Sequence, residues 1–196
     1  ETAAELKSKG YVDAQTYGLV TVMFTDFKDF TKVSERMSAQ ELVVEIDKIY
    51  REFDQIIGKY GIEKIKTIGD AYMCAGGLPK SNLTHAADVV AAAIDIVQFI
   101  QQEIETRKRS NLPYFEIRIG IHTGPLVAGV VGIKKFSYDI WGDAVNIASR
   151  MESSSEAGKI NISETTYQLI KDRYACHHRG KITAKNKGEI DMYFVE

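Results

Sequence analysis

The order in which strand-like and helix-like segments follow one another limits the folds open to this chain. Residues 19–25 (LVTVMFT) form a short, nearly all-apolar run rich in β-branched side chains, which predicts a buried strand. Ser38 and Glu41 have the spacing of a capping box, and apolar residues then recur at helical spacing as far as Ile57. The next expected elements are strands over 62–67 and 71–75, a helix over 83–107 and a strand over 115–121. This β-α-β-β-α-β order predicts an α+β fold with a ferredoxin-like, palm-type core, in which an antiparallel sheet carries helices on one face.

Additional strands and helices are expected after this core. They are a strand over 126–131, a helix over 143–152, a strand over 159–162, a helix over 163–171, and strands over 175–183 and 192–195. A chain of 196 residues, 44% of them hydrophobic, is long enough for one domain with its own core, which we place at residues 17–196. The polar residues 1–16 are expected to be a lead-in segment. Because the first residue is Glu and not Met, we expect a piece of a longer protein whose regulatory domains lie elsewhere.

The composition argues against several classes of protein. The net charge of −2 provides no basic excess for binding nucleic acid or an anionic membrane. No apolar run approaches the roughly 20 residues that a membrane-spanning helix requires, so no membrane contact is expected of this domain. Cys74 and Cys176 lack the spacing of a metal site and are expected to be reduced thiols. These features predict a cytoplasmic location.

Two aspartates stand where this topology brings strand ends together. Asp26 directly follows the first strand, and Asp70 lies in the tight turn between the next two strands. Because the first strand pairs with a strand that follows the first helix, both carboxylates are expected at one edge of the sheet. Such a pair can hold two divalent cations about 3.5–4 Å apart. The same fold order also serves nucleic-acid binders, polymerases and metallochaperones, so the fold alone does not decide the function.

Four motifs narrow the choice. They are FTDFKDFT, IKTIGDAYM, IRIGIHTGPLVAGVVG and YDIWGDAVNIASRMES. In this order and spacing they resemble the class III adenylyl/guanylyl cyclase catalytic domain of the bacterial soluble adenylyl cyclase type, over about residues 18–196. The resemblance implies conversion of ATP into 3′,5′-cyclic AMP and pyrophosphate, with two Mg²⁺ or Mn²⁺ ions at each site.

The resemblance also implies roles for individual residues. Asp26 and Asp70 would hold the metal ions, with the backbone carbonyl of Phe27 as a further ligand. Asn146 and Arg150 would contact the ribose and the phosphate in the transition state. Their spacing of four residues places them on one helix face, and a guanidinium matches a phosphoryl group that gains charge.

The resemblance to this family assigns recognition of the nucleotide base to Lys66 and Asp139. A Lys donor and an Asp acceptor complement the N1 acceptor and the N6 donor of adenine, whereas guanine reverses this pattern. Guanylyl members of the family typically carry an acidic residue and a small residue at these two places. The sequence therefore favours ATP over GTP.

Phosphate binding is assigned to Arg118 and Lys185, and Phe30 and Thr31 from the first motif would also contact the substrate. The register of Lys185 is not fixed, because other lysines crowd the same loop. Asp29 departs from the family pattern: many relatives have Gly there, and an extra acid beside a triphosphate would repel it unless the side chain points away.

The resemblance implies a dimer. In this family the metal ligands and the Asn/Arg pair of one site come from opposite subunits, and this chain contains both sets. We therefore expect a homodimer with two equivalent sites. The alternatives are a diguanylate cyclase or polymerase palm, a non-catalytic ferredoxin-like module, and a partner-dependent cyclase half. The regulator stays open between bicarbonate, calcium and an upstream sensor domain.

Overall fold

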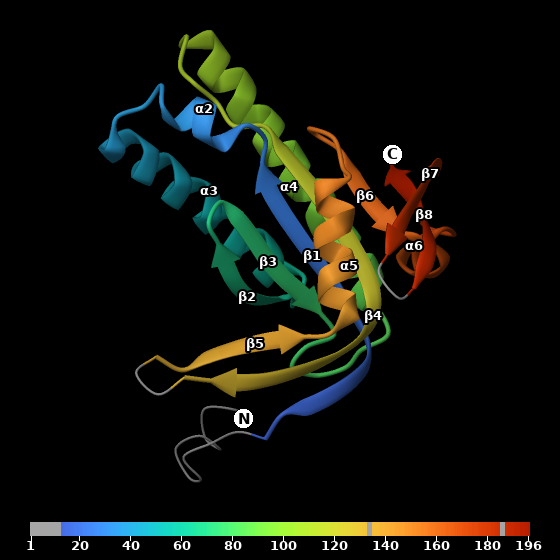
Figure 1. Cartoon of the computed structure of the whole chain (residues 1–196). Helices are drawn as coiled ribbons and strands as arrows, with labels where there is room; N and C mark the ends of the chain where they lie inside the picture. Colours follow the sequence, from blue (N-terminus) through green and yellow to red (C-terminus); the bar gives the residue numbers. More distant parts are fainter. Residues whose placement is uncertain (1–12, 133–134, 185–186) are drawn as a thin grey trace.

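The computed structural model describes residues 13–132, 135–184 and 187–196, arranged as Figure 1 shows. Strands and helices follow the expected β-α-β-β-α-β order, and further elements come after them. The elements are β1 (Gln15–Phe27), α2 (Phe30–Ser34), α3 (Ala39–Lys59), β2 (Glu63–Ile68), β3 (Ala71–Gly76), α4 (His85–Arg109), β4 (Ile117–Val131), β5 (Ser137–Trp141), α5 (Asp143–Ser153), β6 (Ile160–Ser163), α6 (Glu164–Ile170), β7 (Cys176–Ala184) and β8 (Gly188–Val195).

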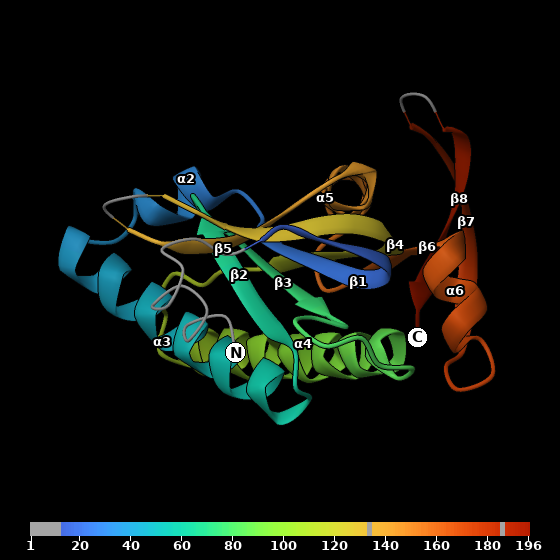
Figure 2. The same cartoon turned by 90° about the horizontal axis from the view of Figure 1, so that it is seen from below.

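The strands form one sheet in the order β2-β3-β1-β4-β6-β8-β7, and β5 pairs with β4. The pairings among β2, β3, β1 and β4 are all antiparallel, which confirms the ferredoxin-like core. Helices α3 and α4 cover one face of this core, and α5 lies on the opposite face, as Figure 2 shows. The expectation of helices on one face therefore holds for the core and not for α5.

Helix α3 begins at the capping box that the sequence predicts. The Ser38 side chain accepts a hydrogen bond from the Glu41 amide at 3.2 Å, and the Glu41 carboxylate accepts one from the Ser38 amide at 2.7 Å. Not every apolar residue of this helix lies on its buried face, because Val43 is 65% exposed. Glu45 is buried and accepts a hydrogen bond from Arg107 of α4 at 2.7 Å.

Strand β4 corrects the expectation of two separate strands around residues 122–125. It runs unbroken for 15 residues, and Gly124 and Leu126 pair with Val20 and Tyr17 of β1. The register of β1 shifts between Tyr17 and Val20, opposite Pro125. Because proline has no N–H to donate, the irregularity opposite it lets the ladder continue on both sides. Strand β1 also begins at Gln15, inside the segment expected as a lead-in.

Helix α5 lies directly on β4. A Cβ atom at Gly120 would stand only 1.8 Å from the backbone nitrogen of Glu152, so glycine is required for this close approach. Ala144 and Ala148 pack with Val22 and Phe24 of β1 in a hydrophobic cluster under the helix. Along the described residues, no helix is both long and apolar enough to cross a bilayer.

Candidate active site

The two aspartates predicted as a metal pair do lie together. Asp26, at the end of β1, is paired in register with Ala71 of β3, and Asp70 directly precedes that residue. Burial, interaction with the Asp70 carboxyl and the negative charge of Glu152 raise the pKa of Asp26 to about 7, while Arg118 opposes this shift. The sheet thus gathers acidic side chains so closely at one edge that ionisation of Asp26 is disfavoured.

The residues at this edge fit a divalent cation. The Oδ1 atom of Asp26 is buried and has no hydrogen-bond partner among the described residues, which is costly unless a ligand satisfies it. Carboxylate oxygens are the preferred ligands of Mg²⁺ and Mn²⁺. Among the described residues no group of three or more His, Cys, Asp and Glu side chains is arranged to hold a metal, so further ligands would have to come from backbone, water or substrate.

Arg118 is the basic residue of this edge. Its NH2 group donates to Asp26 Oδ2 at 3.4 Å, and its Nε lies 3.1 Å from Glu152 Oε1. The position beside Asp26 suits a phosphate contact, as the sequence predicts. Glu152 was not predicted as a site residue, although it lies within the YDIWGDAVNIASRMES motif. It belongs to the buried side of α5, where an acid is unusual, and burial raises its pKa.

Asn146 and Arg150 lie on the outer side of α5. The buried side of the helix is formed by Ala144, Ala148 and Met151, and the predicted pair is exposed on the opposite side. Within the described part of the chain neither side chain has a hydrogen-bond or ion-pair partner. The structure therefore leaves both groups free to contact a molecule outside this chain, on the side of α5 opposite its buried face.

Lys66 and Asp139 meet across two strands that are far apart in sequence. Lys66 of β2 donates to Asp139 Oδ2 of β5 at 2.6 Å, and Asp139 Oδ1 accepts from the Ile140 amide at 2.8 Å. The Asp139 side chain is 12% exposed and that of Lys66 43%. The pair thus presents a fixed acceptor beside a more mobile donor.

The loop after β1 contains the remaining predicted residues. The Phe27 ring is buried and packs at a tilt against the Phe115 ring with centroids 4.9 Å apart, so only its backbone could serve a cation. Phe30 begins α2 and its ring also stacks on Phe115, whereas Thr31 is exposed. Asp29 adopts a left-handed φ of 52°, which favours glycine.

This conformation explains why glycine suits the position of Asp29. The Asp29 carboxylate accepts a hydrogen bond from Lys32 at 3.1 Å, so its charge is partly balanced within α2. Lys185 lies outside the described residues. Nearby in the same loop, Lys187 lies 3.5 Å from Asp143 at the start of α5.

Comparison with known proteins decides between the alternatives. The family described as the adenylate and guanylate cyclase catalytic domain matches residues 12–196. This chain belongs to that family. The cyclase domain is 36% identical over 182 residues to an adenylate cyclase of Mycobacterium tuberculosis, covering 93% of this chain and 40% of the relative. It is 40% identical over 195 residues to human guanylyl cyclase C, covering 97% of this chain and 18% of that protein.

A solved structure confirms the fold of the cyclase domain. The adenylyl cyclase CyaB of P. aeruginosa superposes with a TM-score of 0.88 at 33% identity, covering 94% of this chain and 96% of that one. The cyclase domain spans less than half the length of the two curated relatives. Because these relatives include both adenylate and guanylyl cyclases, family membership establishes a nucleotide cyclase domain. It does not decide whether the substrate base is adenine or guanine, which depends on the residues of the site.

Proposed function

We propose that this domain converts ATP into 3′,5′-cyclic AMP and pyrophosphate as a homodimer with two equivalent sites. The observation that carries the choice of ATP is the contact between Lys66 and Asp139 at 2.6 Å. Asp139 can accept from the N6 amino group of adenine, and Lys66 can donate to N1. Guanine presents a carbonyl acceptor and an N–H donor at the same places, so it would meet the pair with the wrong polarity.

The residues around Asp26 support the phosphate chemistry. Asp26 and Asp70 would hold two Mg²⁺ or Mn²⁺ ions, which when bound would lower the pKa of the ribose 3′-hydroxyl and neutralise charge on the leaving pyrophosphate. Arg118 lies beside these carboxylates and would turn from Asp26 to the triphosphate. Its pairing with Glu152 keeps the guanidinium at this edge of the sheet.

Arg150 and Asn146 supply the transition-state contacts in this proposal. The planar guanidinium of Arg150 can form two hydrogen bonds to equatorial phosphoryl oxygens as they gain charge, which stabilises the transition state more than bound ATP. Asn146, one helical turn earlier, would orient the ribose. Both side chains are exposed on the side of α5 opposite its buried face, which favours a site completed by a second copy.

The surface of the β4–β5 hairpin also favours a dimer. Large apolar side chains are exposed there, among them Val131 at 47%, Phe136 at 53% and Trp141 at 42%. Exposed clusters of this kind are typical of protein interfaces, and aromatic residues dominate their energetics. Asp139 lies on the same hairpin, so a second copy seated here would adjoin the base-reading pair.

Regulatory domains in the remainder of the full-length protein could act by shifting the two copies. Because ATP is a cytoplasmic substrate, the proposal places the domain in the cytoplasm.

A nucleotide assay tests the proposal. The purified domain is incubated with ATP or GTP and with Mg²⁺ or Mn²⁺, over a range of protein concentrations. We expect cyclic AMP from ATP, little cyclic GMP, loss of turnover in EDTA, and a specific activity that rises with protein concentration. Equal or faster turnover of GTP would contradict the base assignment, and a specific activity independent of concentration in a monomeric protein would contradict the shared site.

A further inference from the structure

Tyr50 carries a hydroxyl group that the proposed function does not use. Its oxygen atom is buried, and within residues 13–132, 135–184 and 187–196 it has no hydrogen-bond partner. A buried polar group without a partner lowers the stability of a fold, and a phenylalanine would fill the same space without this cost. The hydroxyl at this place therefore indicates a functional contact.

Three aromatic side chains fix the position of the Tyr50 ring. Tyr50 lies in α3, which covers one face of the sheet in Figure 2. The rings of Phe27, Phe53 and Tyr72 surround it, with centroids between 5.5 and 6.1 Å from its own. Ring pairs at these separations attract one another, so the packing limits the movement of the ring. The hydroxyl is therefore held in one place.

This aromatic cluster adjoins the sheet edge that holds the two aspartates. Phe27 directly follows Asp26 in β1. Tyr72, in β3, follows Asp70 by two residues. Burial and the negative charges of Asp70 and Asp26 raise the pKa of the Tyr50 hydroxyl, and the charge of Asp70 acts on it more strongly than that of Asp26. The hydroxyl therefore stays protonated near pH 7, as a donor within electrostatic reach of both carboxylates.

Tyr72 shows how a hydroxyl of this cluster is satisfied by a carboxylate. Its side chain is completely buried, and its hydroxyl donates to Asp54 Oδ1 at 2.7 Å. The Tyr50 hydroxyl is the same kind of donor, and the carboxylates whose charges act on it are those of the predicted metal pair. A contact with that pair would satisfy it in the same way.

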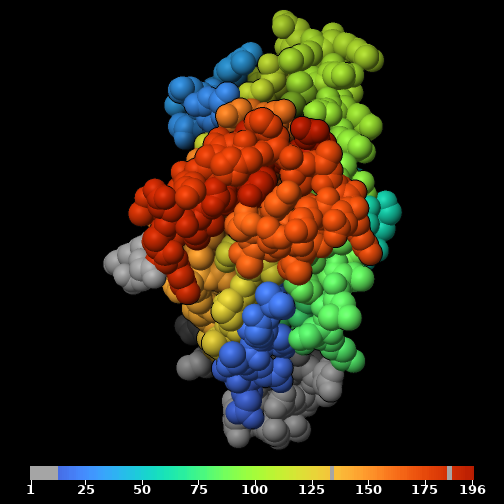
Figure 3. Space-filling model, turned by 90° about the vertical axis from the view of Figure 1, so that its right-hand side faces the viewer, coloured from blue at the N-terminus to red at the C-terminus, as the bar shows by residue number. Residues whose placement is uncertain are grey.

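The larger pocket of the domain contains no comparable unpaired group. It has a volume of about 590 Å³ and is bounded by β4, α5, α6 and β8, on the side where Figure 3 shows the β7–β8 hairpin in red and α6 in orange. Asp143, at its rim, pairs with Lys187 at 3.5 Å. Asp191 pairs with His178 at 2.7 Å. None of the buried atoms that lack a partner in the described part of the chain belongs to its lining.

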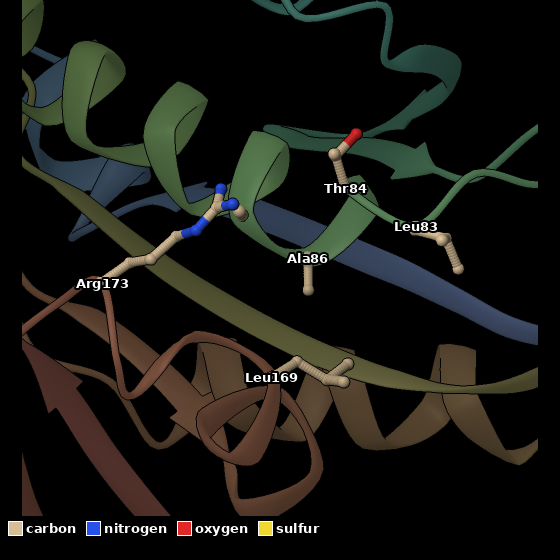
Figure 4. Close-up of a pocket in the computed structure, with 6 residues that line it drawn as sticks. Leu83, Thr84, Ala86, Leu169 and Arg173 are labelled. Carbon is tan, nitrogen blue, oxygen red and sulfur yellow. The ribbon is translucent and has the colours of Figure 1, made fainter.

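A second, smaller pocket also lacks such a group. It has a volume of about 120 Å³ and lies between α4 and α6, where Ala86 and Leu169 face each other in Figure 4. Its polar residues, Thr84 and Arg173, are exposed to solvent. Neither pocket therefore points to a ligand as the Tyr50 hydroxyl points to the aspartates.

We propose that Tyr50 is a positioning residue of the proposed metal site, whose hydroxyl donates to the Asp70 carboxylate when that carboxylate holds a divalent cation. The inference rests on the proposed function, since it takes Asp26 and Asp70 as the metal ligands. A hydrogen bond from a fixed donor orients a ligating carboxylate and favours its ionised form. Because the phenol is neutral, it does so without adding a positive charge that would repel the cation.

Matched tyrosine variants test the proposal in the 196-residue chain without nucleotide. Tyr50→Phe removes the unpaired hydroxyl. Tyr60→Phe, at the C-cap of the same helix, removes a hydroxyl that donates to Asp95 at 2.8 Å. Titration followed by electron paramagnetic resonance measures Mn²⁺ binding, and calorimetry measures melting without metal.

The two variants are expected to behave in opposite ways. Tyr50→Phe should bind Mn²⁺ about tenfold more weakly than the wild type and melt at the same or a higher temperature, because it loses a contact made only in the loaded site. Tyr60→Phe should bind Mn²⁺ as the wild type does and melt at a lower temperature, because it loses a hydrogen bond of the fold. Weaker metal binding without loss of stability is a result that a merely structural role would not give.

Tyrosine ¹³Cζ NMR with Mg²⁺ observes the hydroxyl directly. The signal of Tyr50, identified by its loss in Tyr50→Phe, should shift when Mg²⁺ is added, and that of Tyr60 should not. Equal Mn²⁺ affinity of the two variants, a Tyr50 signal that does not respond to Mg²⁺, or a lower melting temperature for Tyr50→Phe than for Tyr60→Phe would overturn the role of Tyr50 and leave the proposed metal pair intact. A wild type that binds no Mn²⁺ would overturn both.

Discussion

Lys66 Nζ lies 2.6 Å from Asp139 Oδ2, joining β2 to β5 although 73 positions separate the two residues. The contact is formed within one chain and without nucleotide. Its acceptor is held by the Ile140 amide, and its donor is partly exposed. In the proposed function, an adenine base that enters between them would replace this one contact by two hydrogen bonds of its own. The two side chains therefore complement a base whose hydrogen-bonding edge has one donor and one acceptor.

Changing this pair should change the preferred nucleotide. Lys66→Glu combined with Asp139→Cys is expected to lower the ratio of ATP to GTP turnover by about tenfold or more, because the reversed polarity leaves adenine with unpaired polar groups. The kcat/KM values for both nucleotides measure it. Lys64→Glu, on the same strand and paired with Asp54, is the matched control. An unchanged ratio in the double variant would refute base reading by Lys66 and Asp139.

Asp26→Asn should separate stability from activity. The carboxylate is partly buried, has one unpaired oxygen and lies among other acids, so the amide is expected to stabilise the metal-free fold by about 1–3 kcal/mol. Turnover should be lost, and Mn²⁺, which we expect to raise the melting temperature of the wild type, should not raise that of Asp26→Asn. Calorimetric melting with and without Mn²⁺ measures both effects, with the exposed Asp172→Asn as control. A melting temperature that falls in Asp26→Asn would count against a strained metal-free site.

Gly120→Ala should displace α5. The added methyl group would overlap the backbone of Glu152, and backbone cannot yield as a side chain can. We expect a loss of about 3 kcal/mol in the free energy of unfolding and a turnover below a tenth of wild type, because α5 carries Asn146 and Arg150. Urea unfolding and the nucleotide assay measure these. Gly58→Ala, in α3 with open space around the new Cβ, should be tolerated. Equal behaviour of the two variants would contradict the packing described for α5.

His122 should make the fold sensitive to acid. Its folded-state pKa of about 4 lies below the ordinary value of 6.5, so the unfolded chain binds more protons between these values. The contribution to stability is complete above pH 6.5 and is lost as the pH falls, by about 2 kcal/mol between pH 7 and pH 5. His122→Gln should reduce the difference between unfolding free energies measured at these two pH values. The same difference in both proteins would show that His122 is not buried in its neutral form.

The periodic parts of the fold were predictable from sequence. Helices α3 and α4, the β2–β3 hairpin and the meeting of Asp26 with Asp70 follow from local patterns and one topological rule. Strand β5 was missed, because its five residues become a strand only through pairing with β4. The continuity of β4 was also missed, since it depends on an irregularity in β1 that no local pattern in residues 122–125 reveals.

The site was predictable where motifs identify residues and less so where packing decides. Lys66 and Asp139 were assigned by resemblance, and the structure brings them into contact. Glu152 escaped notice because its role depends on the position of α5 over Gly120. Many relatives have Gly at the position of Asp29, and the left-handed backbone conformation of this residue explains that preference. The residue type alone does not indicate this conformation.

Mixing two inactive variants tests the shared site most directly. Asp26→Ala and Arg150→Ala should each abolish turnover, since in the proposed function the first would remove a metal ligand and the second the group that would stabilise the transition state. Equal amounts mixed together should form hybrid dimers that contain one complete site and recover up to about a quarter of wild-type activity by random pairing. The account predicts this recovery of cyclic AMP production. Hybrid dimers that form, as shown by mass spectrometry, and yet stay inactive would contradict it.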